Sequence, residues 1–284
     1  MSKLTDTGSR KAAAPRSRRR RDRGVDPIPV WLWVVGGAVA LYLVLPTLVV
    51  IPSSFSSSSA FKLPPEGFTL RWYQNFFTNP IWLTSLANSF LVALLAAAMA
   101  TVVGTAAAVG LSRMTGRTAS FVRTVLMVSM VTPSIVIAVA VYISFLKWHL
   151  TGSLLGYVLA HAALGVPFVL VAVTSALGGF DAQLLRASAS LGASPIRSFI
   201  TVTMPLISRG ILSGAVFAFA TSFDEVVIAL FLRSPTFQTL PVQMYNSVTY
   251  ELDPTISAAS SLIVVAVTAI FLVPQLISNR KKTD

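Results

Sequence analysis

One uninterrupted run, SLANSFLVALLAAAMATVVGTAAAVGL from Ser85 to Leu111, contains no charged side chain. A helix needs about 20 predominantly apolar residues to cross the hydrocarbon core of a bilayer. Within that core a helix satisfies its backbone hydrogen bonds internally, which an irregular chain facing lipid cannot do. The run is long enough for a transmembrane helix and predicts an integral membrane protein.

Five more apolar runs approach the same length, so we expect an all-α integral membrane protein with six transmembrane helices. None of the runs contains Lys or Arg, and only the fifth contains acidic residues. Pro133 and Pro167 lie inside the third and fourth, where we expect kinks. The other predicted spans are approximately Val30–Ile51, Thr124–Leu146, Leu154–Leu177, Ile211–Leu232 and Ile256–Ile277.

The composition agrees with a membrane protein. Hydrophobic residues make up 54% of the 284 residues and charged residues 11%, whereas about 25% of the residues in an average soluble domain are charged. The net charge of +12 could suggest nucleic-acid binding, but the basic residues are spread between apolar runs, so we expect no nucleic-acid partner. The absence of cysteine excludes disulfides, thiolate metal sites and cysteine nucleophiles.

The distribution of Lys and Arg predicts the orientation, because cytoplasmic segments carry an excess of both. With the N-terminus in the cytoplasm, 18 of the 22 basic residues fall on the cytoplasmic side and four fall on the other. Without the basic N-terminal tail, nine basic residues still fall on the cytoplasmic side and four on the other. Both termini are therefore expected in the cytoplasm, including a short tail at residues 278–284.

Residues 1–29 are polar and rich in arginine, which predicts a disordered cytoplasmic tail that lies against anionic lipid headgroups. A cleaved signal peptide is the alternative, because the basic run precedes an apolar stretch. That stretch is about 22 residues long, whereas the apolar region of a signal peptide has about 7–15 residues. In addition, no A-x-A-like cleavage site follows it. We therefore expect Val30–Ile51 to be retained as the first span.

The longest cytoplasmic connection, Gly178–Gly210, has the signals of two short helices. Gly192 can take the left-handed position that ends the first helix. Ser194 can cap the second through its hydroxyl, and Pro195 suits the first helical position. This pair of helices would expose apolar side chains to water unless a partner covers them, which indicates a docking surface.

This connection resembles the EAA loop of permeases in ATP-binding-cassette importers, a pattern of E-A-A, three residues, G, nine residues and I-x-L-P. The alignment has no gap, but Arg186 replaces the glutamate. SFDEVVIALFL from Ser222 and TLPVQMY from Thr239 resemble the spermidine/putrescine branch of these permeases. The other positions that match the pattern are Ala187, Ser188, Gly192, Val202, Met204 and Pro205.

The resemblance implies a type I ABC importer permease fold in the inner membrane of a bacterium. Its core would span residues 85–277, with the first span as an addition. It also implies a second permease subunit, two ATPase subunits and an extracytoplasmic solute-binding protein. The residues expected to couple this chain to the ATPase within the 178–210 loop are Leu184, Leu185, Arg186, Ala187, Ser188, Gly192, Ile196, Phe199 and Pro205.

The chain has no P-loop, because no lysine follows a glycine. ATP hydrolysis is therefore expected in a separate ATPase subunit, which would use ATP and Mg. We expect this chain to be a transport subunit rather than an enzyme and to bind no cofactor itself. His149 and His161 have no second His or Cys at ligand spacing, so no metal site is expected. For His161, inside the fourth span, we expect a bond to a neighbouring helix rather than a functional role.

Asp224 and Glu225 are the acidic residues of the fifth span, and about 20 Å of helix separates Asp224 from Ile211. Acids within a span usually face the bundle interior or a watery cavity. With Thr221 and Ser222 they would form a polar helix face, and we expect these four residues in the translocation pathway. Because neighbours on a helix point about 100° apart, at most one of the acids is expected to face the pathway.

A carboxylate in the pathway suits a small cationic solute such as spermidine or putrescine. Related permeases carry opines, 4-aminobutyrate, thiamine or ferric ion, and these solutes remain alternatives. A secondary transporter driven by ion flux through the two acids is a further alternative, although no repeated half is evident. A membrane-anchored scaffold without transport activity is another alternative, but such a protein would not require acidic residues within a span.

Overall fold

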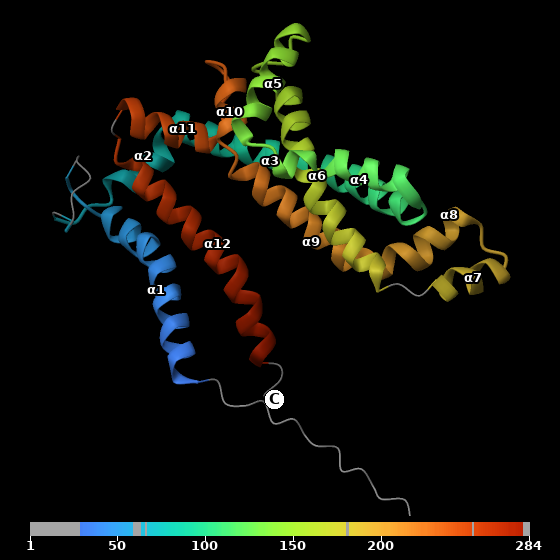
Figure 1. The fold of residues 1–284 in the computed structure, drawn as a ribbon. Helices are drawn as coiled ribbons and strands as arrows, with labels where there is room; N and C mark the ends of the chain where they lie inside the picture. The colour runs from blue at the N-terminus through green and yellow to red at the C-terminus, as the bar shows by residue number, and fades with distance from the viewer. Residues whose placement is uncertain (1–28, 59–63, 66, 180–181, 252, 281–284) are drawn as a thin grey trace, which may run out of the picture. The chain divides into compact units, whose positions relative to one another are not determined.

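The computed structural model describes residues 29–58, 64–65, 67–179, 182–251 and 253–280, without the side chains of residues 182 and 270–280. Of the predicted tails, residues 1–28 and 281–284 lie outside this part of the chain, whereas residues 278–280, predicted as tail, belong to helix α12. Residues up to Pro46 form one unit and residues from Thr47 a second, and each is described by itself. The helices of Figure 1 are α1 (Val30–Ser53), α2 (Arg71–Thr78), α3 (Pro80–Ser112), α4 (Gly116–Val131), α5 (Ser134–Lys147), α6 (Leu154–Gly178), α7 (Ala182–Ser190), α8 (Pro195–Ser198), α9 (Met204–Phe223), α10 (Val227–Leu232), α11 (Leu240–Asn246) and α12 (Thr255–Arg280), with π-helical turns η1 (Phe199–Thr203) and η2 (Ser247–Glu251).

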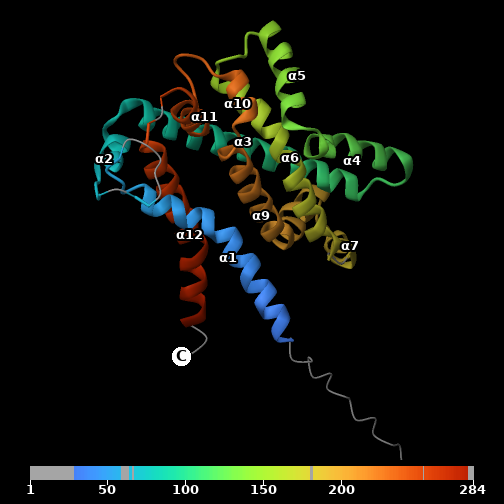
Figure 2. The same ribbon diagram turned by 60° about the vertical axis from the view of Figure 1, so that its left-hand side comes forward.

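Helices α3, α6 and α9 pack against one another and form the centre of the second unit (Figures 1 and 2). Their contact surfaces combine larger apolar residues with many small ones, such as Ala96, Ala100 and Ala218, which are at most 1% exposed. Small side chains let membrane helices approach closely, and packing then replaces the hydrophobic effect that is missing in lipid.

Gly214 shows how close this approach is. A Cβ atom at this position of α9 would lie 2.8 Å from the Cα of Val169 on α6, and that neighbour is a backbone atom that cannot rotate away. The α6–α9 contact therefore requires glycine here.

The apolar helices follow the predicted spans with some differences. Among the described residues α1, α3, α6 and the continuous stretch Pro195–Phe223 are long and apolar enough to cross a membrane. The predicted third span consists of α4 and α5, which meet at an angle of 103°, so the pair makes a fifth crossing only if it counts as one broken span. The sixth predicted span corresponds to α12, whose described apolar part, Thr255–Ala269, is shorter.

The two predicted proline kinks have different outcomes. α4 ends at Val131 and α5 starts at Ser134, so the chain breaks at Pro133, where proline removes a backbone donor and restricts the residue before it. By contrast, α6 continues as one helix through Pro167. Inside a packed membrane bundle, neighbouring groups can compensate for the lost hydrogen bond.

The prediction of one continuous fifth helix over Ile211–Leu232 is wrong. α9 ends at Phe223, three residues follow without helical structure, and α10 starts at Val227. The expected polar helix face that ran from Thr221 to Glu225 therefore does not exist, because the two acids lie in the break.

Side-chain hydrogen bonds fix the segments around this break. The Ser89 hydroxyl on α3 accepts the Leu240 N–H at 2.7 Å, and the Asn88 amide donates to the Gln238 carbonyl at 3.0 Å. On α2, the Asn75 amide donates to the Thr255 hydroxyl at the start of α12 at 2.8 Å. These bonds hold α11 against α3 and the start of α12 against α2, and residues of α11 and α12 share one groove with Phe223 at the end of α9. The α7–α8 hairpin lies at the other end of α9 (Figure 1).

Candidate functional site

Glu225 organises the break between α9 and α10. One of its carboxylate oxygens accepts the Ile228 N–H at 2.9 Å, and the other accepts the Ala229 N–H at the same distance. The first N–H groups of a helix have no partner within the helix, and a carboxylate can satisfy them. The Glu225 side chain is only 7% exposed, so its charge faces the protein interior.

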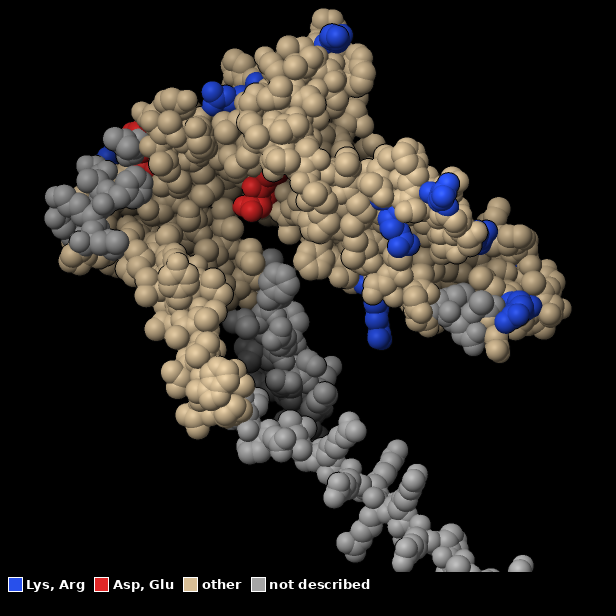
Figure 3. Space-filling model, in the orientation of Figure 1, with Lys and Arg blue, Asp and Glu red and all other residues tan. Residues whose placement is uncertain are grey.

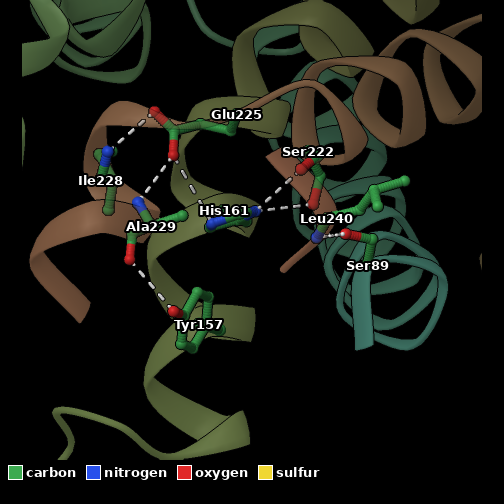
Figure 4. Close-up of polar contacts among 8 residues, drawn as sticks. All are labelled: Ser89, Tyr157, His161, Ser222, Glu225, Ile228, Ala229 and Leu240. Atoms are coloured by element: carbon green, nitrogen blue, oxygen red, sulfur yellow. Dashed lines mark hydrogen bonds and ion pairs between the residues drawn. The ribbon is translucent and has the colours of Figure 1, made fainter. Parts of the chain in front are cut away.

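Two side chains of α6 complete this polar cluster (Figure 4). His161 Nδ1 lies 2.9 Å from the Ser222 hydroxyl and 3.2 Å from the Ser222 carbonyl, while its Nε2 lies 3.9 Å from a Glu225 oxygen. The Tyr157 hydroxyl donates to the Ala229 carbonyl at 3.1 Å. His161 is therefore bonded to a neighbouring helix, as the sequence predicted, and it also faces Glu225.

Asp224 lies beside Glu225 in the chain but in different surroundings. It is exposed, and in the part of the chain that the structure describes its carboxylate takes part in no hydrogen bond or ion pair. Figure 3 shows acidic atoms in a hollow of the face where Figure 1 places the α9–α10 break, while the basic atoms lie elsewhere.

A groove of about 520 Å³ adjoins Asp224. Asp224 is the one charged residue in its lining. The other walls come from the end of α9, from α11 and η2, and from α12, and they are mostly apolar or aromatic. The remaining lining residues are Phe223, Val226, Leu240, Pro241, Met244, Tyr245, Val248, Thr249, Ile256, Ser260, Ile263 and Val264.

The four residues predicted for the pathway do not form one surface. Asp224 lines the groove, Ser222 is buried against His161, Glu225 caps α10, and Thr221 is half-buried on α9. Their functional role stays a prediction, but the geometry separates Asp224 from the other three, because Asp224 is exposed and lines the groove.

The groove walls on α11, η2 and α12 were not identified from the sequence, because they follow Asp224 by 16 to 40 residues. The nearest signal is the TLPVQMY run, which was noted only as a resemblance and which supplies Leu240, Pro241, Met244 and Tyr245. Among the described residues no group of three His, Cys, Asp or Glu side chains is placed to bind a metal ion.

The α7–α8 hairpin confirms the local structure predicted for the 178–210 loop. Gly192 has φ +79°, and the N–H groups of Gly192 and Ala193 bond back to the carbonyls of Ala189 and Ser188, the pattern that closes a helix through a left-handed residue. The Ser194 hydroxyl accepts the Arg197 N–H at 3.3 Å, and Pro195 starts α8.

One contact in the hairpin was missed. The Ser188 hydroxyl donates to the Ser198 hydroxyl at 2.8 Å and so joins α7 to α8. No spacing rule in the sequence predicts this pair, because the nine residues between them include the turn.

The residues predicted to couple the hairpin to a partner are mainly on its surface. Ile196 is 72% exposed and Leu184 is 44% exposed, and Leu191 and Ile200 add further exposed apolar surface. Arg186, Ala187, Gly192 and Pro205 are also exposed, whereas Leu185, Ser188 and Phe199 are half-buried. The hairpin thus presents an apolar surface flanked by arginine.

Comparison with known proteins gives consistent matches. Residues 100–283 match the family described as "Binding-protein-dependent transport system inner membrane component". The chain is similar to the spermidine/putrescine transport system permease protein PotC of Escherichia coli (strain K12), with 33% identity over 247 residues, 86% of this chain and 92% of that protein. It is also similar to a probable molybdenum ABC transporter permease protein of Haloferax volcanii, with 31% identity over 278 residues, 93% of this chain and 98% of that protein.

One solved structure has a similar fold. It is a bacterial ABC transporter involved in the import of the acidic polysaccharide alginate, and it matches with a TM-score of 0.66 over 88% of this chain and 95% of the matched chain. The identity is 16%, so this match concerns the fold alone.

Proposed function

Because the chain belongs to the family of binding-protein-dependent transport system inner membrane components, we propose that it forms part of the translocation pathway for a small cationic solute such as spermidine or putrescine. It is a permease subunit of an ATP-binding-cassette importer, and its role is transport rather than catalysis. In this pathway Asp224 would be the residue that contacts the solute.

The observation that carries the proposal is the position of Asp224 in the groove. A polyamine combines ammonium groups with methylene chains, and the groove combines one free carboxylate with apolar walls. Phe223 and Tyr245 add aromatic rings, whose faces attract cations. The similarity to PotC, a spermidine/putrescine permease by its name, points to the same class of solute.

Similarity alone does not choose the solute, because the relative from Haloferax volcanii is named for molybdenum and is 31% identical. A carboxylate as the one charged group of the groove attracts a cation and repels an oxyanion such as molybdate. The charge of Asp224 therefore favours the cationic solute.

The coupling to ATP belongs to the same proposal. The apolar surface of the α7–α8 hairpin would be covered by an ATPase subunit, with two ATPase copies below two permease subunits. A solute-binding protein would deliver the solute from the opposite side of the membrane. Both termini of this chain would then lie in the cytoplasm, as the Lys and Arg distribution predicts.

The first prediction tests Asp224 in the complete importer, assembled with its partner subunits and reconstituted in proteoliposomes. Asp224→Asn keeps the size of the side chain and removes its charge. A hydrogen bond to a charged group contributes about 1.5–3 kcal/mol, so putrescine uptake per assembled importer should fall by about tenfold or more. Labelled putrescine, with ATP inside the vesicles, measures this rate.

Glu251→Gln is the matched control, because Glu251 is an exposed acid in η2 that does not line the groove. Normal putrescine uptake by Asp224→Asn would remove the residue-level support for a cationic solute. Stimulation of ATP hydrolysis by molybdate instead of polyamine would refute the proposed solute class. Uptake that persists without ATP and stops with a proton ionophore would instead favour a secondary transporter.

A further inference from the structure

We propose that Glu225 and His161 are positioning residues, which clamp the break between α9 and α10 and thereby hold residue 224 in the groove. Glu225 would not contact the solute. The importance of this clamp for transport rests on the proposed function of Asp224, but the clamp itself can be tested without any solute.

Both oxygens of Glu225 bond to the start of α10. Each accepts one backbone N–H at the start of α10, from Ile228 and from Ala229. Both oxygens are thus engaged by the protein, and the side chain is 7% exposed, so a solute cannot displace these bonds without freeing two buried N–H groups.

His161 contacts the other side of the break. His161 is 1% exposed and bonds to the side chain and carbonyl of Ser222 in the last turn of α9. Its Nε2 has no hydrogen-bond partner and lies 3.9 Å from Glu225, so the same ring contacts the end of α9 and the cap of α10. Figure 4 shows the ring between these two segments.

Two residues held by these bonds flank Asp224. Ser222 is held on one side and Ile228 on the other, and Asp224 lies between them with an unengaged carboxylate beside the groove. Without the clamp, the α9 and α10 sequences could join into the continuous helix that their apolar pattern favours. The direction of side chain 224 would then change.

The test uses the absence of native cysteine in this chain. Asp224→Cys is combined with Glu225→Gln in the complete importer, and the rate of modification by a cationic methanethiosulfonate reagent is measured on this chain by mass. Glutamine replaces one acceptor oxygen with a donor NH₂ group, so one of the two hydrogen bonds from the α10 N–H groups is lost. We expect the rate at residue 224 to fall by about tenfold or more, the shift that loss of one hydrogen bond to a charged group produces.

A cysteine at Ser260, on the α12 wall of the same groove, is the reference position. Its modification rate should not change with Glu225→Gln. An unchanged rate at residue 224 would overturn the clamp, and an equal fall at both positions would also overturn it, because the groove would then have collapsed as a whole. His161→Asn should lower the rate at residue 224 in the same direction.

A double-mutant cycle on putrescine uptake distinguishes positioning from direct contact. If Glu225 acts through Asp224, Glu225→Gln should lower uptake in the parent but cause no further loss in Asp224→Asn. If the double mutant instead loses uptake by the product of the two single-mutant factors, Glu225 contacts the solute and the inference is wrong. If Asp224→Asn transports normally while the thiol rates respond as expected, the clamp stands and the proposed solute fails.

Discussion

At the scale of single residues, Asp224 and Glu225 carry the same chemical group but have different surroundings. Glu225 faces the interior, where two backbone N–H groups and the His161 ring surround its carboxylate. Asp224 is exposed and lines the groove. A buried carboxylate needs such partners, whereas an exposed one can bind a cation without losing a structural contact.

Gly192 gives the second prediction. Its φ of +79° lies in the left-handed region, which costs an L-residue about 1–2 kcal/mol and is least accessible to a β-branched side chain. Gly192→Val should distort the turn between α7 and α8 and raise the number of ATP molecules hydrolysed per solute imported. Proteoliposomes in which uptake and ATP hydrolysis are followed together measure this ratio.

Gly192→Asn is the control, because asparagine enters the left-handed region more readily than other residues. It should keep most of the coupling. Equal coupling in Gly192→Val and the parent would show that the turn geometry does not transmit ATP hydrolysis.

At the scale of elements, the apolar spans break at two places with different causes. Pro133 separates α4 from α5 because proline cannot continue the hydrogen-bond pattern of the helix. No proline lies between α9 and α10. That break is stabilised by Glu225, which offers the N–H groups of α10 an alternative to the helix.

The α7–α8 hairpin gives the third prediction. Ile196 is 72% exposed, so Ile196→Glu should leave the hairpin folded but place a charge in the surface that an ATPase would cover. We expect the permease to be made in normal amounts and to lose the ATPase subunits during purification. Densitometry of the purified complex gives the ratio of subunits.

Met114→Glu is the control, since Met114 is an exposed apolar residue of the α3–α4 connection outside the hairpin. It should retain the ATPase. A normal subunit ratio in Ile196→Glu would place the ATPase contact elsewhere on the chain.

At the scale of the whole molecule, the packing of α3, α6 and α9 depends on small residues. Gly214 is a position where an added methyl group would meet backbone, 2.8 Å from Val169 Cα. Overpacking of this kind typically costs about 1–3 kcal/mol. As the fourth prediction, Gly214→Ala should lower the melting temperature and the yield of the assembled importer.

Gly110→Ala on α3 is the matched control, because nothing lies within 4 Å of the added Cβ and alanine favours a helix over glycine. Size-exclusion chromatography after heating measures both variants. Equal melting temperatures would show that α6 and α9 can separate slightly without loss of stability.

The orientation of the chain gives the fifth prediction. The excess of Lys and Arg predicts a cytoplasmic C-terminus, so Lys282→Cys should react with a membrane-impermeant thiol reagent only after the cells are lysed. Lys147→Cys, on the opposite side in this topology, should react in intact cells. The reverse pattern would contradict the charge distribution.

The sequence by itself determined the class of protein and most of its helices. The length of the apolar runs gave the membrane class and the positions of α3 and α6, since both depend on composition along a single segment. Gly192, Ser194 and Pro195 gave the hairpin turn, because caps act within a few residues. The pattern from Arg186 to Pro205 indicated the permease family, which the match over residues 100–283 confirms, and the predicted importer permease fold agrees with the alginate transporter structure.

Only the tertiary structure decided that the fifth span breaks and that Asp224, rather than Glu225, lines the groove. The apolar pattern of Ile211–Leu232 favours one helix. Glu225 opposes it locally by capping α10, and further support for the break comes from elsewhere in the chain, because His161 on α6 bonds to Ser222 before the break and Tyr157 to Ala229 after it. The groove likewise requires α11 and α12, which Ser89 and Asn75 hold in place. A hydrogen bond between distant residues depends on how helices pack, and no local pattern of apolar and polar residues records it.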